Sequence, residues 1–239
     1  MGNGTGKAAL VGGAIALVCI VAFAAAAFLG AVPTAADKIA AVDKSSVLVA
    51  VVLPDSDGVL TVRSLDRYEH VGGPLRIFSI DPLADATVPG TSASTLAEAY
   101  KFGGGDGLAA AYAQGAGAER PGWLIVGPEA WADLMGETSM AVRLNTSIEV
   151  FDGSELYSYP EGTATVSAAE TAQLTNGAAY LDAAGRQAVR EAIGDALAPV
   201  LLRSESTNVD GIDTSLTTEQ WDVWLRGVNT APVRADNTP

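Results

Sequence analysis

The apolar residues of this 239-residue chain form one long run near the N-terminus, followed by short runs of strand length that alternate with helix-like segments. Ser46–Leu53 is the strongest strand pattern, because it is rich in β-branched residues, almost entirely apolar and followed by the turn sequence Pro54–Gly58. Its apolar residues are continuous, which predicts a strand covered on both faces. We expect Val59–Val62 and Leu75–Ile80 to be the second and third strands, with a polar loop at Arg63–Gly73 between them.

Helical periodicity begins after the third strand. Leu96–Phe102 is predicted to be a helix with Thr91, Ser92 or Ser94 as its N-cap, and the glycine run Gly103–Gly105 ends it. Strands that alternate with helices predict an α/β fold, a mixed sheet flanked by helices. Further helices are predicted at Gly107–Gln114 (capped by Asp106), Glu129–Met135, Ser167–Leu174 and Ala183–Leu202, and further strands at Trp123–Val126, Val142–Asn145 and Ser147–Phe151.

The long N-terminal apolar run, Ala8–Ala31, contains no charged residue. About 20 apolar residues suffice to cross a bilayer as a helix, so the run predicts one transmembrane signal-anchor. Lys7 makes residues 1–7 the more positive short flank, which places them in the cytoplasm. The sequence therefore predicts a single-pass protein of the cell membrane, with residues 32–46 as a linker to an extracellular C-terminal domain.

A cleaved signal peptide is the alternative interpretation of this run. Thr34-Ala35-Ala36 places small residues where a cleavage site would need them. The run is longer than the roughly 7–15 apolar residues of a typical signal peptide, which favours the anchor. Cys19, the single cysteine, lies inside the run, so the rest of the chain has no disulfide and no thiol nucleophile.

Composition and charge restrict the classes of function. The chain is 49% hydrophobic, which predicts a folded protein, and its formal net charge of −14 argues against nucleic-acid binding, because phosphates would be repelled. His70 is the single histidine, and neither a nucleophile–base pair nor a zinc-ligand spacing accompanies it. Asp55, Asp57 and Gly58 match the start of a calcium loop but lack its later ligands, so a hairpin turn is the simpler interpretation.

The stretch that follows the third strand carries motifs in an order known from one family. Ser79-Ile80 ends the strand, Pro89-Gly90 closes the loop, and Ala99-Tyr100-x-x-Gly103-Gly104 lies in the next helix. These motifs resemble the central block of the LytR–CpsA–Psr (LCP) family of membrane-anchored bacterial proteins. The resemblance implies an LCP-like α/β sandwich over residues 47–202. It also implies an extracellular domain that transfers glycopolymers from a polyprenyl-pyrophosphate carrier to the cell wall with a divalent cation.

Most of the charged residues that handle phosphate in that family are replaced here. The family's Arg-Asp pair falls on Pro82-Leu83, and its first-strand aspartate, which helps to hold the cation, falls near Ser45-Ser46. Its arginines before the last helix fall on Leu174–Gly177, whereas Arg186-Gln187 matches the Arg-Gln of that helix. The resemblance therefore implies a degenerate LCP-like domain that keeps the scaffold and has lost most of its phosphate-binding charges.

Two sets of candidate site residues follow from the resemblance and from the local chemistry. Asp81 and Asp85 lie near the expected site and are candidate general bases. They are weak candidates, because acidic residues are common in loops and turns without a catalytic role. The candidate substrate-binding residues are two cations near the inferred cleft and a glycine run that precedes a helix: Lys101, Arg186, Gly103, Gly104 and Gly105. Backbone N–H groups of the glycine run could hold an anion, although a plain helix stop needs no ligand. No metal ligand or cofactor is predicted, and Mg²⁺ is expected only if the domain is as active as the family.

The last part of the chain, residues 203–239, is acidic and turn-rich and is predicted to be a C-terminal tail. Thr217–Gln220 can begin one short helix that presents Trp221, Trp224 and Leu225 on one face. Beyond Asn229 we expect disorder.

Three functions are compatible with these features. The favoured one is a membrane-anchored envelope protein that binds a polyprenyl-linked glycopolymer, a wall component or a catalytic relative without transferring it. The second is an active transferase, supported if at least two of the following cations converge on Asp81 or Asp85: Arg63, Arg67, Arg76, Lys101 and Arg186. The third is a scaffold of an envelope complex that docks through Trp221–Leu225.

Overall fold

The computed structural model of the chain describes residues 46–69, 74–203, 211–227 and 233–235. Among these residues, no helix is both long enough and apolar enough to cross a membrane. The anchor predicted at Ala8–Ala31, the cleavage-site alternative and His70 lie outside the described residues.

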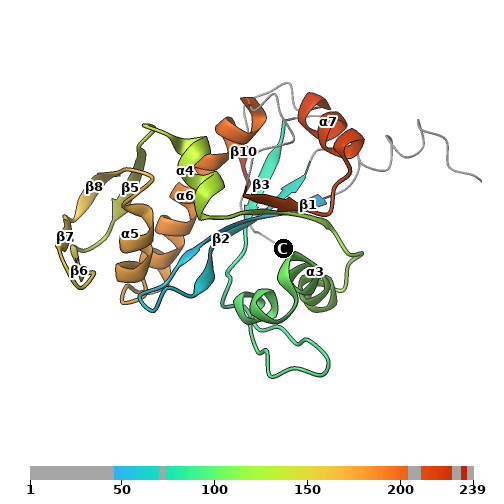
Figure 1. Cartoon of the computed structure of the whole chain (residues 1–239), viewed down its shortest axis with the longest axis horizontal. Helices are drawn as coiled ribbons and strands as arrows, with labels where there is room; N and C mark the ends of the chain where they lie inside the picture. Colours follow the sequence, from blue (N-terminus) through green and yellow to red (C-terminus); the bar gives the residue numbers. More distant parts are fainter. Residues whose placement is uncertain (1–45, 70–73, 204–210, 228–232, 236–239) are drawn as a thin grey trace, which may run out of the picture. The chain divides into compact units, whose positions relative to one another are not determined.

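A six-stranded mixed sheet forms the centre of the described fold, in the order β10-β3-β2-β1-β4-β9. β1 lies in its middle and pairs antiparallel with β2 and parallel with β4. The mixed sheet flanked by helices agrees with the fold class predicted from the alternation of strands and helices (Figure 1). The strands are β1 (Ser46–Pro54), β2 (Leu60–Glu69), β3 (Arg76–Ser79), β4 (Gly122–Val126), β9 (Ile212–Thr214) and β10 (Val233–Arg234).

Both faces of β1 are covered, as its continuous apolar sequence predicts. Val47, Val49 and Val51 belong to a core shared with α4 (Pro128–Met135) and α6 (Ala183–Arg203). The alternate residues of β1 belong to a second core shared with α3 (Leu96–Ala116). Figure 1 shows α3 on the opposite side of the sheet from α4 and α6. The period-2 alternation of a strand thus divides one apolar run between two cores.

The polar loop predicted at Arg63–Gly73 is wrong for Arg63–Glu69, because β2 continues to Glu69. Along this part of β2, Leu65 and Tyr68 are fully buried, and the polar residues Ser64 and Asp66 are buried as well. The sequence pattern did not predict this part of the strand, because its buried polar side chains interact with residues that only the tertiary structure brings near.

The N-cap of α3 is Thr95, whose Oγ1 accepts a hydrogen bond from the backbone N–H of Glu98 at 3.2 Å. None of the three residues predicted as N-caps begins this helix. Gly104 has a non-helical backbone conformation (φ 57°), so α3 consists of two helical segments joined at a kink. The predicted break at the glycine run is therefore present, although the two segments are continuous in the chain.

Two pairs of short antiparallel strands and a helix lie beyond α6 in the part of the fold drawn in yellow (Figure 1). β5 (Met140–Leu144) pairs with β8 (Gly162–Val166), and β6 (Ile148–Phe151) pairs with β7 (Leu156–Tyr159). β7 and β8 were not predicted, because short, largely exposed strands have little apolar pattern. α5 (Thr171–Ala178) begins four residues later than predicted, although Glu170 does accept hydrogen bonds from the backbone N–H and hydroxyl of Ser167.

The C-terminal residues are part of the fold, which corrects the prediction of a tail. β9 pairs with β4 at one edge of the central sheet, and β10 pairs with β3 at the other edge. Disorder beyond Asn229 is therefore the wrong prediction for Val233 and Arg234. The predicted short helix is present as α7 (Thr218–Gly227), and Trp221 and Trp224 are both buried. Trp224 stacks on Tyr68 of β2 with ring centroids 5.9 Å apart.

Arg234 of β10 forms the main polar contact between the C-terminal residues and the core. Its Nη1 donates to Oδ1 of Asp66 at 3.1 Å, and its Nε donates to Oδ1 of Asp195 at 2.8 Å. The Asp66 side chain is only 3% exposed. Burial raises the pKa of Asp66 to about 6, although the neighbouring Arg234 acts in the opposite direction.

The raised pKa of Asp66 predicts a pH-dependent stability. A carboxyl whose pKa is higher in the folded than in the unfolded chain makes folding most favourable at low pH, and this contribution is lost as pH rises through about 6. The contribution of Asp66 to the free energy of unfolding should therefore fall by about 2–3 kcal/mol between pH 4 and pH 7. Urea unfolding of wild type and Asp66→Asn across this range isolates the effect, and a constant difference between the two proteins would contradict it.

Candidate functional site

Three arginine side chains line one cavity of about 160 Å³ on the α6 side of the sheet. Arg63 comes from β2, and Arg186 and Arg190 come from successive turns of α6. We call this cavity the arginine pocket. Its other lining residues are Thr61, Val62, Pro82, Leu83, Ala97, Thr175, Ala178, Ala179 and Val189.

The guanidinium of Arg63 is held in place by two acceptors. Its Nη2 donates to the carbonyl oxygen of Pro54 at 2.8 Å and to Oδ1 of Asn176. Its Nε is buried and has no hydrogen-bond partner among the described residues. Burial lowers the pKa of Arg63, which shows that its charge is poorly solvated.

Arg186 and Arg190 are four residues apart on α6, so their side chains extend over the same helix face. Nη1 of Arg186 donates to the carbonyl oxygen of Leu181. Arg190 is only 13% exposed, its Nη1 lies 3.5 Å from Oδ1 of Asp81, and its Nε is buried without a partner among the described residues. Burial lowers the pKa of Arg190, the Asp81 carboxylate opposes this shift, and the Arg186 charge adds to it.

Arginines outnumber the carboxylates that contact them in the pocket. Arg190 is paired with Asp81, whose carboxylate also accepts a hydrogen bond from the backbone N–H of Leu83 at 3.0 Å. The more distant charges of Asp55 and Glu191 act on Arg63 and Arg190, respectively. Two buried N–H donors without partners cost free energy unless a ligand or water accepts from them. Arginine forks bind phosphate and carboxylate oxygens in a bidentate way. The pocket is therefore arranged to bind a small anionic group such as a phosphate or pyrophosphate.

A divalent cation does not fit the arginine pocket. Mg²⁺ and Ca²⁺ take oxygen ligands, usually including carboxylates. Among the described residues, Asp81 is the carboxylate that contacts a pocket arginine, and it is already paired with Arg190. In the described part of the chain, no group of three or more His, Cys, Asp or Glu residues could hold a metal ion.

The predicted site residues are only partly brought together. Arg186 lines the arginine pocket, and Asp81 reaches it through Arg190. Asp85 is exposed and forms an isolated backbone bridge with Thr95. Lys101 is exposed on α3 and is not among the lining residues.

The other cations named for an active enzyme divide in the same way. Arg63 and Arg186, two of the five named cations, both line the pocket that Arg190 also lines. Arg67 and Arg76 instead lie over the ring of Phe78, at 4.5 and 5.2 Å from its centroid. Among the described residues, the carboxylate of Asp81 is paired with Arg190, which is not one of the five named cations, so the convergence on Asp81 that the transferase hypothesis requires stays a prediction.

Sequence reasoning missed the contribution of Arg190. Arg190 was not among the candidate residues drawn from the sequence, although its spacing of four residues from Arg186 in one predicted helix was the available signal. Arg63 was considered only as one of five unplaced cations. Both residues stand at positions different from those that bear the arginines in the resembled family.

The glycine run serves helix packing in this structure. None of Gly103, Gly104 and Gly105 lines the arginine pocket. A Cβ on Gly105 would lie 2.3 Å from two ring carbons of Trp123, so only glycine allows α3 to approach β4 this closely. A Cβ on Gly103 would meet no atom within 4 Å.

Alanine substitutions at these two glycines separate packing from anion binding. We expect Gly105→Ala to lower the free energy of unfolding by about 1–3 kcal/mol, because the buried Trp123 ring must move. The matched substitution Gly103→Ala should not lower stability, since the added methyl group has open space. Chemical denaturation measures both, and wild-type stability in Gly105→Ala would contradict the packing role. A loss of pyrophosphate binding in a fully stable Gly103→Ala would restore the anion-binding interpretation.

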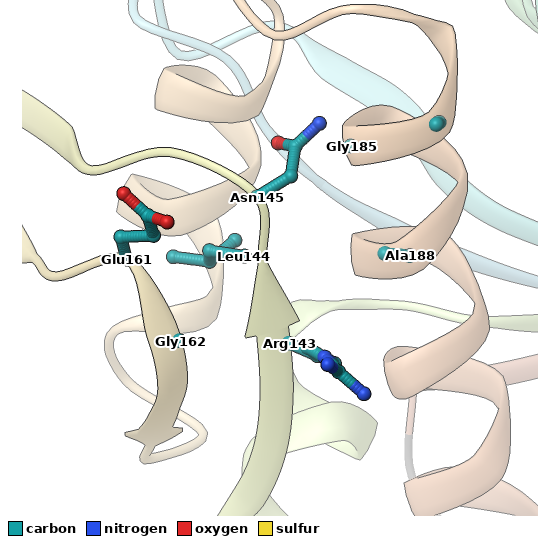
Figure 2. Close-up of a pocket in the computed structure, with 8 residues that line it drawn as sticks. Arg143, Leu144, Asn145, Glu161, Gly162, Gly185 and Ala188 are labelled. Carbon is teal, nitrogen blue, oxygen red and sulfur yellow. The ribbon is translucent and has the colours of Figure 1, made fainter.

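A larger cavity of about 450 Å³ lies between α6 and the β5–β8 strand pair. Figure 2 shows Arg143 and Asn145 on the α6 side of β5, whereas Glu161 lies on the opposite side of that strand. The Asn145 amide already donates to both carboxylate oxygens of Asp182, at 3.1 and 3.2 Å. One cation and one anion, both exposed, define no ligand charge, so the smaller arginine pocket is the candidate site.

Solved structures share this fold. TagT bound to LI-WTA matches with a TM-score of 0.55 and 14% identity, over 80% of this chain and 78% of that chain. TagT bound to LIIa-WTA matches with a TM-score of 0.53 and 14% identity over the same shares. TagV of B. subtilis matches with a TM-score of 0.53 and 15% identity, over 82% of this chain and 86% of that chain.

TagT and TagV are LCP-family proteins, so the described fold is LCP-like. No protein-family model and no curated protein sequence matches the chain. At identities this low, the structural likeness establishes the fold, and the chemistry must be argued from the arginine pocket itself.

Proposed function

We propose that this chain is a cell-envelope protein whose LCP-like domain binds the pyrophosphate group of a lipid-linked glycopolymer in the arginine pocket. The observation that carries the proposal is that three arginines line one small cavity. Two of the three have a buried Nε without a partner among the described residues. The chain has a formal net charge of −14, so a local cluster of three arginines stands out from its surroundings. This cluster is the strongest feature that points to an anionic ligand.

The walls and the rim of the pocket favour an amphiphilic ligand over a free anion. Val62, Ala178 and Val189 are apolar residues that line the same pocket. The lining residue Leu83 is 57% exposed. An exposed apolar side chain at a cationic pocket suits a ligand with an anionic head and an apolar chain. A cavity of about 160 Å³ has room for the head alone, so the chain would lie on the rim.

The class of ligand follows from the structural likeness together with this chemistry. One matching structure is described as TagT bound to LI-WTA and another as TagT bound to LIIa-WTA. A polyprenyl-linked glycopolymer is therefore the ligand class that we propose for this chain. The apolar run Ala8–Ala31 would anchor the protein in the membrane beside such a ligand, with the LCP-like domain outside the cell.

Transfer of the bound polymer is a second candidate function, favoured by the Arg190–Asp81 contact at 3.5 Å. In such a reaction, an acceptor hydroxyl would lose its proton to Asp81 and form a bond to the phosphorus that carries the glycan. The bridging P–O bond of the pyrophosphate would break and leave the lipid monophosphate. The guanidiniums would stabilise the charge that develops on the leaving oxygen. Binding requires only the arginines, so it is the function that the geometry supports best.

Isothermal titration of the full-length chain tests the proposal. We expect saturable binding of farnesyl pyrophosphate and weaker binding of inorganic pyrophosphate, each unchanged by EDTA because the pocket does not fit a divalent cation. Absence of binding by either compound, or complete loss of binding in EDTA, would contradict the proposal. Release of lipid monophosphate in the presence of a wall acceptor would add transfer to binding.

A further inference from the structure

We infer that Arg234, in the last described strand, is a positioning residue that holds Arg190 in place in the arginine pocket. The inference rests on the proposed function, because it assigns a role in that pocket to a residue outside it. Arg234 is not among the lining residues. It is separated from Arg190 by 44 positions in the sequence and acts through Asp66, Ser64 and the backbone of α6.

The first step of the connection is the set of acceptors around the Arg234 guanidinium. Nη1 donates to Asp66 on β2 at 3.1 Å, whereas Nε donates to Asp195 on α6 at 2.8 Å. Nη2 donates to the carbonyl oxygen of Glu191, also on α6, at 3.0 Å. One side chain thus ties β2 to α6 directly beside Arg190.

The second step runs from Asp66 to Arg190 itself. Oγ of Ser64 lies 3.4 Å from Oδ2 of Asp66 and 3.1 Å from the carbonyl oxygen of Arg190. Its single proton is shared between these acceptors, so the serine links the buried carboxylate to the backbone that carries the pocket arginine. Ser64 also follows Arg63 directly in β2, which brings a second pocket arginine into the same arrangement.

The approach of α6 to Asp66 depends on a glycine. A Cβ on Gly194 would lie 2.0 Å from Oδ2 of Asp66 and 2.9 Å from Nη2 of Arg234. Only a glycine at this turn of α6 leaves room for the carboxylate and the guanidinium between helix and sheet. The contact is therefore built into the packing of the helix that supplies Arg186 and Arg190.

The ladder of β10 places Arg234 with respect to the third element of the pocket. The backbone N–H of Val233 donates to the carbonyl oxygen of Leu75, and that of Ala235 donates to the carbonyl oxygen of Ile77, both at 2.8 Å. β3 then leads into Asp81, the partner of Arg190. Arg234 consequently contacts or adjoins each element that carries a charged residue of the pocket, namely β2, the end of β3 and α6.

A double-mutant cycle on the full-length chain tests this role, with inorganic pyrophosphate as the probe. We expect Arg234→Ala to raise the Kd for pyrophosphate by about tenfold in the wild-type background and by less than about twofold in the Arg190→Ala background. A merely structural role would not produce this dependence on Arg190. Arg120→Ala, which removes a half-exposed ion pair with Asp106 outside the pocket, is the matched control and should bind as wild type.

A second variant guards against loss of folding in Arg234→Ala. Arg234→Lys keeps the charge but cannot reach three acceptors with one planar group, so it should fold and still bind pyrophosphate more weakly than wild type. Wild-type affinity in either variant would overturn the inference and leave the proposed function standing. No binding by the wild-type chain would overturn both.

Discussion

Replacing Arg190 by alanine is expected to weaken the binding of inorganic pyrophosphate by about 10- to 100-fold. A hydrogen bond to a charged group contributes about 1.5–3 kcal/mol, and every 1.4 kcal/mol changes a dissociation constant tenfold. The Arg190 side chain is only 13% exposed, and its guanidinium is paired with the carboxylate of Asp81. Isothermal titration at 25 °C measures the change, with a thermal melt of each protein to show that it is folded.

The matched control for this substitution is Arg143→Ala. Arg143 lines the larger cavity on the other side of α6 and is exposed, so its removal takes away the same charge without touching the arginine pocket. We expect it to bind pyrophosphate as wild type does. Equal losses in Arg143→Ala and Arg190→Ala would show that pyrophosphate responds only to net charge, which would contradict a specific pocket.

Replacing Trp224 by alanine is expected to lower the free energy of unfolding by about 3–5 kcal/mol. The side chain is only 1% exposed and stacks on Tyr68, so the substitution leaves a large cavity between α7 and the sheet. If the C-terminal residues were a tail outside the fold, the same substitution would not change the free energy of unfolding. Urea denaturation followed by circular dichroism measures the difference.

Tyr180→Ala provides the comparison for an aromatic side chain that contributes no buried surface. Its exposed side chain makes a change of more than about 0.5 kcal/mol unexpected. Wild-type stability in Trp224→Ala would show that the C-terminal residues are dispensable to the core. That result would also remove the structural basis for a role of Arg234.

The strongly apolar elements could be predicted from the sequence, because their own apolar residues indicate that they are buried. Ser46–Leu53 was recognised as a strand covered on both faces, and Ala183–Leu202 was recognised as a helix. The later half of β2 was missed, because Ser64 and Asp66 are buried polar residues whose partners lie far along the chain. β9 and β10 were missed because two- and three-residue strands at sheet edges have no periodicity.

The candidate site was harder to predict than the fold. Asp81 and Arg186 were selected from their place relative to the LCP motifs, and the structure brings both to the arginine pocket. The expectation that most phosphate-binding charges are lost was drawn position by position along the resembled motifs. Arg63 and Arg190 reach the same cavity from other positions, which only the packing of α6 against β2 shows.

The arginine pocket also explains why so acidic a chain can present a site for an anion. The guanidiniums of Arg63 and Arg186 donate to neutral acceptors, including the carbonyl oxygens of Pro54 and Leu181, whereas that of Arg190 is paired with Asp81. Among the described residues, no carboxylate in contact neutralises the charges of Arg63 and Arg186. Close-range hydrogen bonds from fixed guanidiniums decide the interaction, because the net charge of the chain acts at longer distance and is screened by salt.

A crystal structure of the chain soaked with inorganic pyrophosphate tests the central claim most directly. The account predicts density for the anion in the arginine pocket, within hydrogen-bond distance of the guanidiniums of Arg63, Arg186 and Arg190. An empty pocket at saturating pyrophosphate, or density only at another site, would contradict it.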